Sequence, residues 1–177
     1  LESGDCIFCS LHVSYIAGMM MIFRARHLQL DMYIVPPSAQ PISAIVLEKL
    51  GQKKYTKKLF FAFVPLQLQQ ILEEDAARDL LYNAKAILVG GAPILATLQA
   101  KIRHYPFSVW ATYGMTETVS HVAIQAYSPV YTPYFTALSD IQLRQNASGC
   151  LEIFSKMSGS DWLITNDLVE MVSEKSF

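Results

Sequence analysis

Charged side chains are scarce in this sequence, and neither sign predominates. Only 16% of the 177 residues are charged, and the net charge is −1, whereas ordinary domains carry about 25% charged residues. The chain therefore lacks the basic stripe that nucleic-acid binding requires, and we expect no nucleic-acid partner. Its apolar fraction is 52%, above the usual ~45–50%. We therefore expect some apolar surface to be covered by the rest of a longer protein or by a partner chain, and a homo-oligomer is possible.

Long uninterrupted apolar runs and paired cysteines are also missing. The most apolar stretch, residues 7–23, is broken by polar residues and by Gly18, so a strand followed by a buried helix fits better than a membrane span. Cys6 and Cys9 form a lone CxxC without a second pair, and core packing explains them better than zinc or redox chemistry. The three cysteines fit a reducing cytosol, so we expect a cytoplasmic protein.

What is present is an alternation of strand-like and helix-like segments over the first two thirds of the chain. Short apolar runs that end at proline or glycine predict strands, and longer segments with helical spacing predict helices. The predicted strands are 5–10, 32–35, 59–64, 86–89 and 108–112, and the predicted helices are 15–28, 42–50, 66–81 and 93–105. The lysine-rich residues 53–58 read as a solvated turn. Repeated strand–helix units predict an α/β fold with a mostly parallel sheet and flanking helices over residues 1–118.

After Thr118 the pattern changes to short alternating runs separated by turn residues. This pattern predicts an antiparallel β region over residues 119–177, as a small distorted barrel or a sheet against the first. The runs are 121–126, 135–143, 150–155 and 162–172, with turns at 146–149 and 158–161. We therefore expect two subdomains that meet near residue 118.

The most informative segments are two glycine-containing loops that follow neighbouring predicted strands. Gly90-Gly91-Ala92-Pro93 follows the strand 86–89, and residues 113–118, YGMTET, follow the strand 108–112. Ligands in open α/β sheets lie beyond the carboxyl ends of strands, so a flat ring fits between the bare glycine backbone and the Tyr113 ring. The hydroxyl of Thr116 suits a phosphate oxygen, and the carboxylate of Glu117 suits Mg²⁺. The two loops together predict a nucleotide site.

These motifs resemble the adenylate-forming acyl-CoA synthetase (AMP-binding) superfamily, whose members activate carboxylic acids with ATP. GGAP followed by YGMTET carries the resemblance, and residues 163–167, LITND, resemble the superfamily's Thr-Gly-Asp segment. The o-succinylbenzoate-CoA ligases are the most similar branch. The segments that resemble them are residues 11–18, residues 63–69 (FVPLQLQ) and residues 113–123 (YGMTETVSHVA).

The resemblance implies a two-step reaction in which a carboxylate attacks ATP to form an acyl-adenylate, and the thiol of coenzyme A then displaces AMP. In that scheme Thr116 and Glu117 are the catalytic residues, Glu117 binds Mg²⁺, and Asp167 holds the ribose. The residues implied to contact ATP or AMP are Gly91, Ala92, Pro93, Thr112, Tyr113, Gly114, Met115, Thr116 and Asp167. The residues implied to border the acyl group are Tyr15, Gly18, Gly90 and His121. The implied acid is o-succinylbenzoate, an intermediate of menaquinone biosynthesis. The implied nucleotide- and acyl-binding part is residues 1–118.

The sequence also departs from the superfamily pattern. Tyr15 stands where His is frequent, His12 where Pro is common, and Asn166 where Gly often precedes the aspartate. A Ser/Thr/Gly-rich phosphate loop with its lysine is not found, and neither is the lysine-bearing C-terminal domain. In the family these lie before and after the matching region. We therefore expect the middle piece of a larger enzyme's N-terminal domain, with the remainder of the parent chain as its partner and without activity by itself.

Simpler explanations remain open for each singled-out feature. The glycine pair fits an ordinary tight turn, Tyr113 a core aromatic, Thr116 with Glu117 a helix cap, Asp167 a hairpin turn, and His121 a packed histidine. Two other functions also remain open. One is another aryl- or acyl-CoA synthetase or a peptide-synthetase adenylation domain, and the other is a non-catalytic nucleotide-binding or interaction module.

Overall fold

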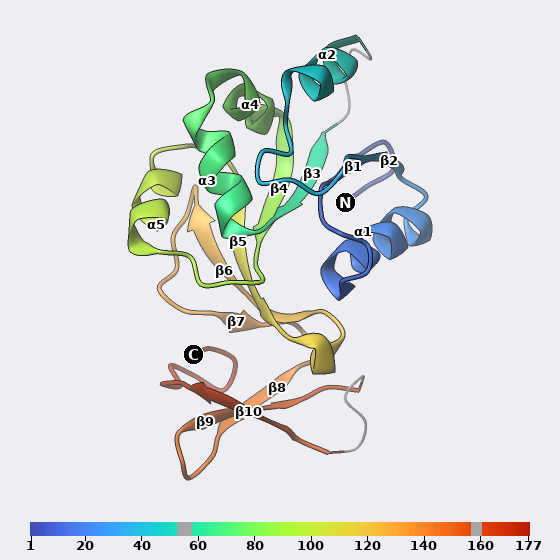
Figure 1. The fold of residues 1–177 in the computed structure, drawn as a ribbon. Coiled ribbons are helices and arrows are strands. Elements are labelled where there is room, and N and C mark those ends of the chain that lie inside the picture. Colours follow the sequence, from blue (N-terminus) through green and yellow to red (C-terminus); the bar gives the residue numbers. More distant parts are fainter. Residues whose placement is uncertain (53–57, 157–160) are drawn as a thin grey trace.

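The computed structural model describes residues 1–52, 58–156 and 161–177. Most of the lysine-rich turn predicted at 53–58 and of the turn predicted at 158–161 therefore lies outside the described residues. Within the described residues the chain forms two sheets, a larger one of seven strands and a smaller one of three (Figure 1). The α/β fold class predicted from the sequence is confirmed.

The larger sheet has the order β2-β1-β3-β4-β5-β6-β7. Strands β1 to β5 are parallel, and β6 and β7 join the same sheet in antiparallel fashion. The strands are β1 (Cys6–Cys9), β2 (Asp31–Ile34), β3 (Leu59–Phe63), β4 (Ala84–Val89), β5 (Val109–Gly114), β6 (His121–Ser128) and β7 (Thr136–Ala137). The run 121–126, expected in the separate antiparallel region, thus lies beside β5 in the larger sheet. The predicted run 135–143 is in fact split between the two sheets.

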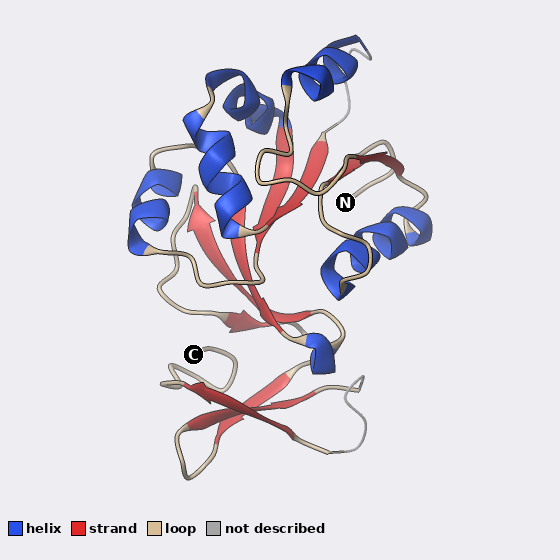
Figure 2. Cartoon of the chain, viewed as in Figure 1, coloured by secondary structure: helices blue, strands red, loops and turns tan. Residues whose placement is uncertain are grey.

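Helices cover both faces of the larger sheet, as Figure 2 shows. One face packs against α2 (Ala44–Gln52), α3 (Pro65–Glu73), α4 (Asp75–Leu80) and α5 (Ala96–Arg103), and the other packs against α1 (Ile16–His27). Cys6 faces the first cluster and Cys9 the second, because successive strand residues point to opposite faces. Both thiols are buried and carry no disulfide, so their predicted role in core packing is confirmed.

The single helix predicted over 66–81 was wrong, because the chain breaks at Glu74. Glu74 has extended backbone angles, φ −110° and ψ 116°, between α3 and α4. This break shifts the helical phase, so that Ala77 is buried and Ala76 is exposed. The apolar residues that precede the break, among them Leu68 and Ile71, are buried as the spacing predicts.

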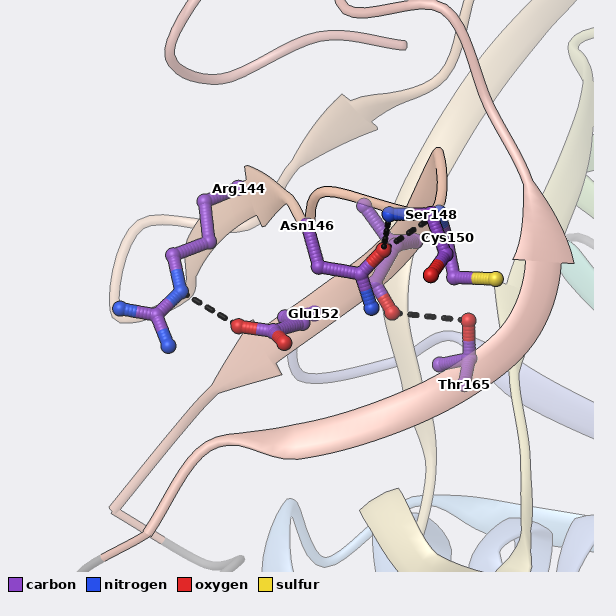
Figure 3. Close-up of polar contacts among 7 residues, drawn as sticks. Arg144, Asn146, Ser148, Cys150, Glu152 and Thr165 are labelled. Carbon is purple, nitrogen blue, oxygen red and sulfur yellow. Dashed lines mark hydrogen bonds and ion pairs between the residues drawn. The ribbon is translucent and has the colours of Figure 1, made fainter.

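The smaller sheet contains β8 (Gln142–Gln145), β9 (Cys150–Phe154) and β10 (Leu163–Leu168), all antiparallel. Polar side chains add contacts between and within its strands (Figure 3). Arg144 Nε lies 2.5 Å from the buried Glu152 Oε2, and the Asn146 side chain accepts the amides of Ser148 and Cys150. Thr165 Oγ1 donates to Leu151 O at 2.8 Å. This last bond ties β10 to β9 in the middle of the sheet.

Apolar side chains on the outer side of α1 are exposed. Tyr15 is 72% exposed and Phe23 is 54% exposed, with Met19 and Ile22 close to 40%. Some of the apolar surplus of the sequence therefore lies on the surface of the described chain. Among the described residues, no helix combines the length and the apolarity needed to cross a membrane.

Candidate nucleotide and acyl site

The two glycine loops lie side by side at the carboxyl ends of β4 and β5. Gly90 packs closely on β5, because a Cβ there would come within 2.1 Å of Thr112 Oγ1 and would force that side chain to move. Gly91 has φ +81°, a left-handed conformation that glycine adopts without strain. The amide of Gly90 also donates to Phe63 O at 3.2 Å. The loop is thus a tight turn that brings its bare backbone next to Thr112.

A cavity of about 390 Å³ opens beside these loops, within the size range of small-molecule sites. Val89 and Ala111 line it from β4 and β5, and the predicted residues Ala92, Pro93 and Thr112 also line it. The sequence prediction missed four further lining residues, Gln125, Tyr127, Tyr131 and Phe135. These residues belong to β6 and to the segment that follows it, which the sequence pattern had assigned to a separate region. The alternating pattern of residues 121–126 did predict a strand. It could not indicate that this strand pairs with β5, which places these residues at the cavity.

Tyr113 stands at the end of β5 and connects the two sheets. Its ring contacts Phe135 and Phe177, with centroid distances of 5.9 and 5.1 Å. Its hydroxyl donates to Asp167 Oδ2 at 2.5 Å. Partial burial and this hydrogen bond raise the pKa of Tyr113 well above its ordinary value, so the phenol remains a donor at neutral pH. Tyr113 is therefore more than a core aromatic, since its polar end holds another predicted site residue.

Asp167 lies within strand β10, and the hairpin-turn alternative for it was wrong. Its carboxylate is exposed, and its amide donates to Thr165 Oγ1 at 3.2 Å. The pairing of β10 with β9 shifts register between Ile164 and Leu168, which is typical of a bulge that redirects a side chain. Thr165 is fixed in turn by its bond to Leu151 O. The smaller sheet therefore presents Asp167 to the end of β5.

The residues after β5 form a short 3₁₀ helix, η2 (Thr116–Thr118), at the border between the two sheets (Figure 1). The helix-cap alternative for Thr116 was wrong: Met115 is the N-cap residue, and its amide donates to Thr118 Oγ1 at 3.0 Å. Thr118 is buried, whereas Thr116 and Glu117 are exposed. Val119 has φ +64°, a strained conformation for a β-branched residue, and such strain is often found at functional sites.

His121 is packed directly against the loop that carries Thr116 and Glu117. A Cβ at Gly114 would lie 2.6 Å from His121 Cα, so only glycine permits this approach. Burial, together with the nearby Arg24 guanidinium, lowers the pKa of His121 to about 4. Arg24 extends from α1, and its Nη2 donates to Ser120 Oγ at 3.3 Å. His121 is thus a neutral, packed histidine beside the loop, and Arg24 is a neighbour that the sequence prediction missed.

The other two residues predicted to border the acyl group lie at the beginning of α1. Tyr15 is the N-cap residue and is exposed, with its ring 5.8 Å from that of His12. Gly18 packs on the preceding loop, because a Cβ there would lie 2.4 Å from His12 O. At 1.5 Å per residue, Tyr15 and Arg24 are roughly 13 Å apart along the helix axis. The structure therefore brings His121 to the Arg24 end of α1 and gives Gly18 a packing role.

The side chains near η2 could supply only part of the ligands of a metal ion, so a bound metal would also need ligands that the protein does not provide. Among the residues that the structure describes, no group of three or more His, Cys, Asp or Glu side chains could hold a metal. Glu117 is a single exposed carboxylate. Mg²⁺ usually binds one or two carboxylates together with phosphate oxygens and water, so Glu117 fits Mg²⁺ with a phosphorylated substrate better than a metal held only by the protein.

Comparison with known proteins shows that solved structures share this fold. An acyl-CoA synthetase (AMP-forming)/AMP-acid ligase II-like protein from Dyadobacter fermentans is 34% identical with a TM-score of 0.85, over 99% of this chain and 48% of that chain. An o-succinylbenzoate coenzyme A synthetase from Bacillus subtilis, in complex with ATP and magnesium ion, is 18% identical with a TM-score of 0.70, over 92% of this chain and 35% of that one.

A curated relative is a 2-succinylbenzoate–CoA ligase from a Geobacillus species, 24% identical over 127 residues. The match covers 71% of this chain and 24% of the ligase, so the chain spans about a quarter of this relative and at most about half of the solved structures described above. Residues 1–141, which include both glycine loops and all of β6, match the family described as AMP-binding enzyme. The chain belongs to the AMP-binding enzyme family.

Proposed function

We propose that this chain forms the nucleotide- and acyl-binding part of an ATP-dependent acid–CoA ligase. The observation that carries the proposal is the Tyr113–Asp167 hydrogen bond of 2.5 Å, beside a cavity that Ala92, Pro93 and Thr112 line. A cavity that combines aliphatic and aromatic side chains with the polar groups of Thr112 and Gln125 suits a flat adenine ring, and a carboxylate suits two adjacent ribose hydroxyls. The bond to Tyr113 engages Oδ2 of Asp167 and leaves Oδ1 available for the ribose.

The exposed residues of η2 are suited to the phosphates. Thr116 offers a hydroxyl to the α-phosphate, and Glu117 offers a carboxylate to Mg²⁺, which neutralises phosphate charge when it is bound. Gly91, Gly114 and Met115 contribute backbone around the nucleotide. Little covalent chemistry is asked of the protein in the first step, so positioning and charge neutralisation account for its contribution. The attacking group is the carboxylate of the acid, and the product is an acyl-adenylate with release of pyrophosphate.

In the second step, the thiol of coenzyme A attacks the acyl carbon and AMP leaves. We assign the acyl group to the side of the loop that faces α1, where His121 and Gly90 border it and where Tyr15 and Gly18 begin the helix. The acid we favour is o-succinylbenzoate, which would give the reaction a place in menaquinone biosynthesis, and the similarity to a 24% identical ligase for this acid supports it. None of the three cysteines carries a disulfide, which fits the reducing cytoplasm.

Titration of AMP into the chain by calorimetry tests the nucleotide site. We expect Asp167→Ala to weaken AMP binding by roughly 1–3 kcal/mol, the scale for hydrogen bonds to a charged group. Asp140→Ala, at another exposed aspartate, is the matched control and should bind AMP as the unchanged chain does. Equal affinities for all three proteins would refute the ribose assignment.

The reaction is tested with the complete protein that carries these residues, supplied with ATP, Mg²⁺ and coenzyme A. We expect a higher kcat/KM for o-succinylbenzoate than for benzoate, phenylacetate or medium-chain fatty acids. The 177 residues alone should not catalyse ATP–pyrophosphate exchange, because they contain no glycine-rich phosphate loop with a lysine. A preference for benzoate or a fatty acid would overturn the choice of acid and leave the adenylate-forming chemistry in place.

A further inference from the structure

Gln125 is a buried amide side chain that lines the cavity beside the two glycine loops. It is 6% exposed, and it lies in β6 directly across from Ala111 of β5. Tyr113 follows two residues after Ala111, so the two side chains share one face of β5. Because Ala111 carries only a methyl group, Gln125 is the polar member of this strand pair. A base beside the Tyr113 ring therefore lies next to the Gln125 amide.

The orientation of this amide is fixed by Thr132. Gln125 Nε2 donates to Thr132 O at 2.8 Å. Thr132 is itself held against β6, because its amide donates to Ala126 O at 2.9 Å and its Oγ1 accepts the amide of Ala126 at 3.1 Å. A backbone carbonyl can only accept a hydrogen bond, so the nitrogen of the Gln125 amide has to face Thr132. Turning the amide over would bring two oxygens together and leave both without a donor.

One acceptor and one donor of the Gln125 amide remain for a ligand. Oε1 has no hydrogen-bond partner among the described residues. Within that part of the chain, only Ser10 Oγ is a fully buried side-chain atom without a partner, so Oε1 stays accessible in a residue that lines the cavity. The second N–H of the amide is also free. Glutamine pairs with adenine through such a donor and acceptor, which match the 6-amino group and a ring nitrogen.

We propose that Gln125, held in place by Thr132, selects adenine over purines that carry an oxygen at position 6. The inference rests on the proposed nucleotide site and extends it to the residue that reads the base. With adenine, Oε1 accepts a hydrogen bond from the 6-amino group. With hypoxanthine or guanine, Oε1 meets the oxygen at position 6, and the bond to Thr132 O keeps the amide from turning over to donate instead. Two buried acceptors are then left unpaired, which is costly.

The test compares AMP with inosine monophosphate (IMP), which has an oxygen in place of the 6-amino group. Each is titrated by calorimetry into the complete protein that carries these residues. We expect the unchanged protein to bind AMP about 10- to 100-fold more tightly than IMP, the scale for leaving buried acceptors unpaired. Gln125→Met keeps the length of the side chain without its amide, and it should reduce this ratio to about threefold or less, mainly by weakening AMP binding.

Gln99→Met is the matched control. Gln99 also lines the cavity, and its Nε2 also donates to a backbone carbonyl, Ile94 O, at 2.8 Å. It belongs to α5 and not to the strand pair beside Tyr113, so this variant should keep the ratio of AMP to IMP affinity. If Gln99→Met and Gln125→Met lose the preference to the same extent, the cavity as a whole selects the base, and the role of Gln125 is overturned.

The other outcomes separate this inference from the proposed function. If the unchanged protein binds neither nucleotide, the proposed nucleotide site fails and the role of Gln125 fails with it. If it binds AMP and IMP equally, or if Gln125→Met keeps the preference for AMP, only the role of Gln125 is overturned. Asp167→Ala should weaken AMP and IMP alike and keep their ratio, because the two nucleotides share the ribose.

Should Gln125→Met not fold, Gln125→Glu decides the matter. An ionised carboxylate accepts from the 6-amino group, and a protonated one donates to Thr132 O and still presents an acceptor oxygen to the base. A preference for AMP that survives in Gln125→Glu would support the proposal, and its loss would contradict the proposal.

Discussion

The two sheets of this protein position the proposed site in different ways. The larger sheet is packed on both faces by helices and contains two clusters of buried apolar residues. At Gly114, the loop after β5 packs on backbone atoms so closely that only glycine fits. The smaller sheet has one apolar cluster and depends on the Arg144–Glu152 pair and on side-chain bonds such as that of Thr165 to Leu151 O. The loops at the ends of β4 and β5 are therefore fixed by packing, whereas Asp167 is placed by a few polar contacts.

Among the substitutions considered, we expect Gly114→Ala, in the tightly packed larger sheet, to cause the largest loss of stability. The added Cβ would lie 2.6 Å from His121 Cα and from Ser120 O, and backbone atoms cannot move aside as a flexible side chain can. We expect the free energy of unfolding, measured by urea denaturation, to fall by about 3 kcal/mol. Gly4→Ala is the control, because a Cβ there meets nothing within 4 Å and only the left-handed backbone costs energy, about 1 kcal/mol. Equal losses in the two variants would show that the contact at Gly114 is not tight.

We expect acid to lower the free energy of unfolding, because His121 lies in the same packed region. The pKa of this histidine is about 4 in the folded chain, against 6.5 ordinarily, so between these values the unfolded chain binds a proton that the folded chain does not. The free energy of unfolding therefore decreases as the pH falls from about 6.5 to about 4. After allowance for partial exposure, the loss is roughly 2–3 kcal/mol.

The measurement is the difference between the unchanged chain and His121→Gln across this pH range. Subtracting the two removes the effect of the carboxylates, which also titrate in acid. His104→Gln, at an exposed histidine, is the control and should follow the unchanged chain. If the stability of His121→Gln falls with pH as steeply as that of the unchanged chain, His121 is not the group responsible.

Arg144→Met tests how far the smaller sheet depends on its polar contacts. The substitution leaves Glu152, whose side chain is 8% exposed, without its cation. Breaking a buried pair costs 3–5 kcal/mol, but Arg144 is 54% exposed, so we expect a loss of about 2 kcal/mol. Hydrogen exchange should show lower protection in β8, β9 and β10 and little change in β1 to β5. Glu152→Gln in the same background should recover part of the loss, and protection lost evenly in both sheets would contradict the separation.

The contrast between the sheets also explains which features the sequence revealed. The loops of the larger sheet were predicted because each follows a short apolar run, and neighbouring parallel strands end at the same edge. The cavity residues Gln125 and Tyr127 were missed because an alternating strand pattern does not specify its partner strand. Arg24 was missed for a related reason: its contact with Ser120 joins residues 96 positions apart, and no local pattern signals it. The placement of Asp167 within β10 depends on a register shift that sequence alternation does not encode.

The smallest expected effect concerns the bond that joins the two sheets. Tyr113→Phe removes the phenol that donates to Asp167 Oδ2 at 2.5 Å and keeps the ring contacts with Phe135 and Phe177. Asp167→Asn removes the charge from the other side. Because the carboxylate is exposed, we expect a coupling of about 1 kcal/mol from the double-mutant cycle of unfolding free energies. A coupling near zero would mean that the aromatic cluster alone joins the sheets, and that Tyr113 places Asp167 for the nucleotide without adding to stability.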